Sequence, residues 1–110
     1  MSPRSSLGDF ERNVLWAISR LGSNAYGTNI IEEVETIIDR EASVGALYTS
    51  LKRLEQKSLV TSKLGDATPE RGGRAKRYFN LTAAGERSLR DALEEIRRLS
   101  TTLIGIPEAV

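Results

Sequence analysis

The chain has 110 residues, with sixteen Lys or Arg, fifteen Asp or Glu, and neither cysteine nor histidine. A chain of this length forms one domain with a modest core. The missing cysteine and histidine exclude disulfides, thiolate nucleophiles, thiolate zinc sites and the usual acid–base side chain of neutral pH. The sequence also has no paired-carboxylate spacing and no phosphate-binding glycine loop, so we expect no enzyme, cofactor or metal site.

The N-terminus, MSPRSSLGDF, contains no apolar signal core. No segment approaches the roughly 18 apolar residues of a membrane span. We therefore expect a cytoplasmic protein without a membrane partner.

The net charge of +1 hides a basic middle segment. Residues 40–80 carry nine basic and four acidic side chains, whereas the remainder carries seven basic and eleven acidic ones. Such an asymmetry favours a polyanionic partner.

Three helices are predicted in the first half of the chain. Apolar residues recur at helical spacing in residues 7–22 and again in residues 25–39, and the short connection places these two helices side by side. A third helix is expected from Ser43, which can cap its N-terminus, to about Ser58. The apolar stripe of this third helix comprises Val44, Leu47, Leu51 and Leu54.

A hairpin and a last helix complete the chain. Segments 59–64 and 75–81 suit strands and flank a loop rich in Gly, Pro, Asp and Arg. Thr82 can cap a final helix that runs to about Ile104, and Pro107 ends regular structure. Three short helices followed by a hairpin with a basic loop are typical of a winged helix-turn-helix.

The expected fold is therefore mainly α with a small β hairpin. Residues 1–81 form the winged-helix domain, with residues 1–6 as a flexible arm. Residues 82–110 form a C-terminal dimerisation helix and tail.

The third helix, at about 43–58, is the candidate recognition helix, because a helix fits the major groove of DNA and its N-terminal half reaches the base edges. Tyr48 either packs inward with its hydroxyl on a phosphate or is a half-buried core residue. A basic wing at about 65–77 suits the minor groove or the flanking phosphates. The predicted contacts to double-stranded DNA are Ser43, Gly45, Ala46, Tyr48, Thr49, Lys52 and Arg53 from the helix, and Arg71, Arg74, Lys76 and Arg77 from the wing.

The last helix carries an apolar stripe longer than three short helices can cover, which predicts a second copy of the chain. Trp16 lies roughly opposite the stripe of the first helix and is expected to be covered by the last helix of either subunit. The predicted homodimer interface comprises Trp16, Leu89, Leu93, Ile96, Leu99 and Leu103. An aromatic residue beside this seam could also line a small-molecule pocket.

These residues resemble the PadR-like bacterial transcriptional regulators. The resemblance runs through AYGTNI at 25–30, GALYTSLKRLEQKSLV at 45–60 and RGGRAKRYFNLTAAG at 71–85, and covers nearly the whole chain. It implies a homodimeric winged-helix repressor whose C-terminal helix makes the dimer, and the single helix resembles the compact branch of the family. Ser58 stands where the family usually places glycine.

The resemblance further implies that Tyr48, the first turn of its helix and the wing around Arg74 and Lys76 meet DNA at a pseudo-palindromic operator. An effector near the dimer seam is common in the family. The alternative is a winged-helix module that docks a protein and does not bind DNA. The operator, the target genes, the identity of any effector and the choice between repressor and activator are not encoded in these features.

Overall fold

The computed structural model describes residues 7–65 and 75–104, with the side chains of residues 103 and 104 left undescribed. The elements follow the order α1 (Asp9–Leu21), a 3-10 turn η2 (Gly22–Asn24), α2 (Gly27–Ile38), α3 (Val44–Gln56), β1 (Val60–Leu64), β2 (Arg77–Leu81) and α4 (Ala83–Leu99). A π-helical turn, η4 (Ser100–Ile104), follows α4. The predicted winged-helix fold, mainly α with one small hairpin, is confirmed, although α4 ends as a regular α-helix five residues before Ile104.

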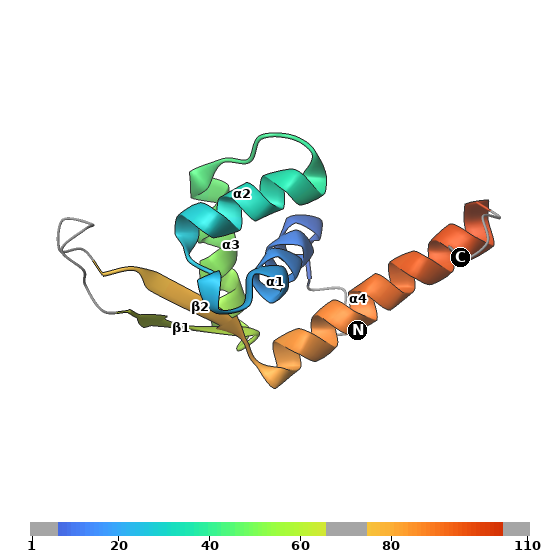
Figure 1. The fold of residues 1–110 in the computed structure, drawn as a ribbon. Helices are drawn as coiled ribbons and strands as arrows, with labels where there is room; N and C mark the ends of the chain where they lie inside the picture. Colours follow the sequence, from blue (N-terminus) through green and yellow to red (C-terminus); the bar gives the residue numbers. More distant parts are fainter. Residues whose placement is uncertain (1–6, 66–74, 105–110) are drawn as a thin grey trace.

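Helix α1 is the centre of the packing. It contacts α2, α3, β2 and α4, and Val14, Leu15 and Ala17 are fully buried at these contacts. Figure 1 shows α1, α2 and α3 gathered above the strands, with β1 and β2 extending to one side of this group and α4 to the other. The N-terminal part of the chain therefore forms the folded body, and the hairpin and α4 extend from it.

The sheet is an antiparallel pair in which Val60 faces Leu81 and Leu64 faces Arg77. The turn before α2 extends it, because Tyr26 forms a bridge with Tyr78 and the Phe79 amide donates to the Ala25 carbonyl at 2.9 Å. The side chain of Phe79 is buried in the core. Residues near 25 thus attach the base of the wing to the helical body.

The helix ends follow local chemistry. As predicted, the Ser43 and Thr82 side chains cap their helices by accepting from the Ala46 and Gly85 amides. At the end of α3, the Leu59 amide donates to the Leu54 carbonyl and the Ser58 amide donates to the Glu55 carbonyl, which is a Schellman motif.

This motif requires a left-handed residue, and Ser58 adopts φ +61°. The position where the family usually places glycine is therefore left-handed here too. A side chain there costs about 1–2 kcal/mol relative to right-handed backbone.

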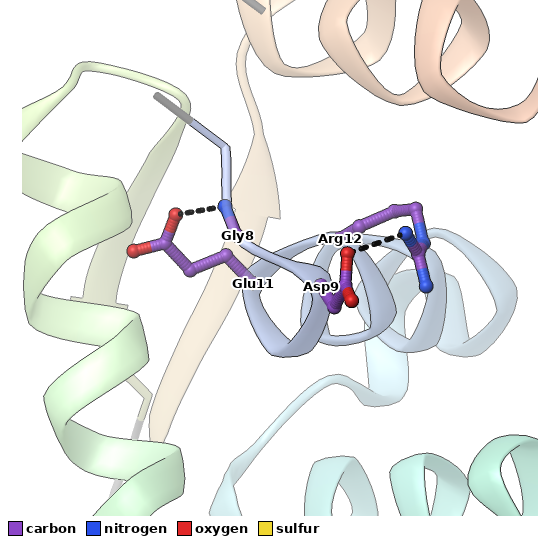
Figure 2. A network of polar contacts seen from close by, with 4 residues as sticks. All are labelled: Gly8, Asp9, Glu11 and Arg12. Atoms are coloured by element: carbon purple, nitrogen blue, oxygen red, sulfur yellow. Dashed lines mark hydrogen bonds and ion pairs between the residues drawn. The ribbon is translucent and has the colours of Figure 1, made fainter. Parts of the chain in front are cut away.

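The start of α1 is joined to the end of α3. Glu11 is 6% exposed, and its carboxylate accepts from the Gly8 amide at 3.1 Å and from Lys57 Nζ at 2.8 Å. Figure 2 shows the Glu11 carboxylate turned back to Gly8, with the Asp9–Arg12 pair on another side of the helix. Glu11 thereby caps α1 and holds the C-terminal end of α3 beside it.

The first turn of α4 packs on backbone. The Thr82 amide donates to the Leu59 carbonyl at 3.0 Å, and the Thr82 hydroxyl donates to the Ser58 carbonyl at 2.8 Å. A Cβ on Gly85 would come within 2.0 Å of the Leu59 carbonyl oxygen. Gly85 is therefore the residue that lets α4 approach the chain just before β1.

Gly85→Ala should destabilise the fold, roughly by the 1–3 kcal/mol typical of overpacking or more, because the opposing atom is backbone and cannot rotate away. Gly45→Ala adds the same methyl group on the exposed side of α3, where its nearest neighbour would be Ser43 Oγ at 3.6 Å. It should stabilise the helix by up to about 1 kcal/mol. Urea unfolding of both variants measures the difference. Equal stability of the two would contradict the close approach at Gly85.

Candidate nucleic-acid interface

Helix α3 has one buried and one exposed side. Leu47, Leu51 and Leu54 are at most 2% exposed and pack into the core. The opposite side is exposed along its whole length and brings together the predicted contacts Gly45, Ala46, Tyr48, Thr49, Lys52 and Arg53, with Ser43 exposed just before the helix.

Val44 departs from the prediction. Its spacing from Leu47 and Leu51 placed it on the apolar stripe, yet it is 59% exposed. Val44 is the first residue of α3, so it lies one turn before the leucines that fill the core. The apolar stripe of the sequence is therefore one turn longer than the buried face, and the first turn of α3 presents an aliphatic side chain outward.

Tyr48 is 51% exposed, so about half of its surface is covered by the rest of the protein. Its hydroxyl lies against Gly27 at the start of α2, where a Cβ would come within 2.3 Å of it. Gly27 thus leaves room for the hydroxyl between the beginning of α2 and the exposed side of α3. Sequence reasoning assigned no role to this glycine, although it stands in the AYGTNI motif.

A hollow of about 530 Å³ lies between the start of α2, Tyr48 and β2. Its walls include Lys76, whose Nζ lies 3.6 Å from the centre of the Tyr26 ring in a cation–π contact. The Tyr26 ring meets Tyr78 edge-on at 5.4 Å between centres. The hollow is lined by Tyr26, Gly27, Thr28, Tyr48, Ala75, Lys76, Arg77 and Phe79. A hydroxyl and two cations around one concave surface suit an anionic group.

Arg77 has a second function that the sequence did not indicate. Its guanidinium donates to Ser62 Oγ at 3.1 Å, and Ser62 donates to the Glu55 carboxylate at 2.7 Å. This chain of contacts joins the last turn of α3 to both strands of the wing. Arg71 and Arg74, the other predicted wing contacts, lie outside the described residues.

Helix α4 is buried only near its start. Leu89 is 6% exposed and Leu93 is partly buried, but Ile96 and Leu99 are 42% and 49% exposed. Trp16 is partly buried against the core, and the side chain of Leu103 is not described. The apolar stripe therefore leaves the body after about three turns, as the sequence predicted.

The exposed part of α4 forms one wall of an open groove of about 850 Å³, with the start of α1 as the other. Apolar residues of the groove include Leu7, Leu59, Ala92, Ile96 and Leu99. On another side of α4, a hydrogen bond from Arg97 lowers the pKa of Glu94 from its ordinary value. The groove side of α4 is mixed, because Arg87, Asp91 and Glu95 line the groove beside the apolar residues.

None of the helices in residues 7–65 and 75–104 is long and apolar enough to cross a membrane. The packing of three helices against a hairpin, with the exposed side of α3 beside the wing, defines a winged-helix protein. The sequence profile of the transcriptional regulator PadR-like family matches residues 14–91. The chain belongs to this family, whose members are DNA-binding transcription regulators.

Solved structures share the fold. A PadR-like transcription factor from Bacteroides fragilis is 23% identical, with a TM-score of 0.74 and 94% of each chain covered. A PadR family transcription regulator from Clostridium difficile is 24% identical, with a TM-score of 0.68, over 88% of this chain and 99% of that one. The protein hsRosR-S1, solved as a complex, is 27% identical, with a TM-score of 0.71, and the match covers 92% of this chain and 82% of that one. A comparison with curated proteins finds no match.

Gly27→Ala should displace the Tyr48 hydroxyl without unfolding the protein, because the opposing atom is the end of a side chain. If that hydroxyl contacts a phosphate, DNA affinity should fall roughly tenfold, the loss expected for one hydrogen bond to a charged group. Tyr48→Phe removes the hydroxyl without a clash and is the matched control. The double variant should bind no worse than either single variant. Additive losses in a fluorescence anisotropy titration would show that Gly27 and Tyr48 act separately.

Proposed function

We propose that this protein is a homodimeric repressor that binds a pseudo-palindromic operator through α3 and the wing. One observation carries the proposal. The exposed side of α3 has small, hydroxyl-bearing and basic residues, while the leucines of its other side are buried in the core. A recognition helix needs this division, because its backbone must approach the base edges while its position stays fixed.

The exposed residues of α3 have different proposed roles according to their position along the helix. Gly45, Ala46 and Thr49 belong to the N-terminal half, where the backbone approaches the bases. Lys52 and Arg53 follow one turn later, at the level of the phosphates that border the groove. The hollow beside Tyr48 and Lys76 receives a neighbouring phosphate, and the wing loop, including Arg71 and Arg74, adds charge along the flanking backbone.

The dimer follows from the uncovered part of α4. Ile96 and Leu99 are half exposed on a helix that projects from the body, and they border a groove whose other wall is α1. A second copy related by a two-fold axis would bury this apolar surface on both subunits at once. Two recognition helices would then meet half-sites about one helical turn apart. Leu93, Leu103 and Trp16 belong to the same proposed seam.

The same geometry supports regulation by a small molecule. The groove between α1 and α4 has the size of a small-ligand site. Lys57, at the end of α3, lines this groove and is paired with Glu11 of α1. An effector held near the dimer seam would therefore act close to the recognition helix. The chemical class of that effector is not specified by the residues of the groove.

DNA binding is tested by titrating the protein against the DNA upstream of its own gene and against a scrambled duplex, across a range of salt concentrations. Lys52→Ala with Arg53→Ala should lower the slope of log affinity against log salt by up to about two units, because each removed phosphate contact changes it by about 0.9. Arg90→Ala, on the exposed side of α4, removes a charge away from the interface and should leave the slope unchanged. Identical slopes for all proteins would remove α3 from the interface.

The seam is tested by Ile96→Asp, which places a charge in the middle of the proposed apolar contact and should shift the protein to monomer. Arg90→Asp introduces the same side chain in α4 outside the groove and should leave the dimer intact. Sedimentation at micromolar concentration distinguishes the species. A stable Ile96→Asp dimer would exclude this seam.

A further inference from the structure

The first turn of α3 presents an apolar surface at the place where a recognition helix meets the bases. Val44 is 59% exposed, and the next two residues in the sequence, Gly45 and Ala46, are exposed too. A single exposed aliphatic residue is common on protein surfaces. Its position here is informative, because it lies in the first turn of the helix whose exposed side carries Lys52 and Arg53, which match a polyanion.

The polar groups nearest to this turn point away from the outward surface at Val44. Ser43 Oγ accepts from the Ala46 amide at 2.9 Å, so the hydroxyl is held against the helix end. The Tyr48 hydroxyl is turned to Gly27 and the hollow beside β2. The outward surface at Val44 therefore offers methyl groups, with the next polar side chain, Thr49, more than one turn further along.

Apolar side chains can read only one feature of the major groove. The base edges there present hydrogen-bond donors and acceptors, and the single apolar group among them is the 5-methyl of thymine. Donors and acceptors placed against Val44 would lose water without gaining a partner, which is unfavourable. A thymine methyl placed there would gain contact at no such cost.

We propose that Val44 reads a thymine methyl group in each half-site, so that the operator carries thymine opposite the first turn of α3. This inference rests on the proposed function and adds the chemical identity of a group that is recognised. Gly45 has no side chain, and it is exposed, so the backbone of this turn can approach the base edge.

The test replaces thymine by uracil, one position at a time, in the footprinted half-site. This exchange removes one methyl group and keeps every hydrogen-bonding group of the base. At the thymine opposite Val44, wild-type affinity should fall about fourfold, the value of one buried carbon. Val44→Ala should bind the thymine duplex more weakly and lose most of the thymine-over-uracil preference. Val44 is exposed, so this variant should keep its fold.

Lys52→Ala is the matched control from the same side of α3. It should weaken binding to the thymine and uracil duplexes by the same factor and so keep the wild-type preference. A wild-type protein that binds all the duplexes equally would overturn the reading of thymine and leave DNA binding standing. A preference unchanged in Val44→Ala would also overturn it, because another residue would then read the methyl. Failure of the wild type to bind any duplex would instead overturn the proposed function.

Discussion

The packing of α3 against α1 is the contact on which the proposed interface depends. Leu47, Leu51 and Leu54 on α3 meet a core in which Val14 and Leu15 of α1 are fully buried. Each of these leucines contributes about 1.5–3 kcal/mol relative to an exposed side chain. Because the leucines occupy one side of the helix, their burial fixes which residues face outward. The exposed side is therefore available to a partner.

The contacts around this core hold the ends of α3 and the wing. Glu11 and Lys57 join the end of α3 to the start of α1 at 2.8 Å. On the far side, Ser62 connects Glu55 with Arg77, so the last turn of α3 and both strands share one set of hydrogen bonds. A recognition helix and a wing bound to each other approach DNA as one surface, and less conformational freedom is lost on binding.

Helix α4 is attached to this body only at its beginning. Its first turn rests on the Leu59 carbonyl next to Gly85, and its second half projects beyond the core. The radius of gyration is 15.5 Å, compared with about 13 Å for a compact chain of this length. The difference reflects the hairpin and α4, which both extend from the body. The exposed Ile96 and Leu99 of α4 are the physical basis of the proposed dimer.

Periodicity and capping residues were sufficient to predict the order of elements. Helix starts at Ser43 and Thr82 were predicted from their side-chain oxygens and are confirmed. The prediction was wrong at Val44, because periodicity gives the direction of a side chain and not how far along the helix the core extends. The Gly27–Tyr48 and Glu55–Ser62–Arg77 contacts join residues from different elements, and no local pattern in the sequence records them. Residues 66–74, with Arg71 and Arg74, lie outside the described structure, so the tip of the predicted wing stays a prediction.

The central claim is that the exposed side of α3, with the hollow beside Tyr48, is the surface that contacts DNA. Backbone amide shifts of isotope-labelled protein, recorded by NMR during titration with the upstream duplex, test it directly. The account predicts that the largest changes fall on residues 43–53, on Thr28 and on Lys76, with small changes on the acidic outer side of α2. Large changes confined to α2 or to the second half of α4, with α3 unaffected, would contradict it.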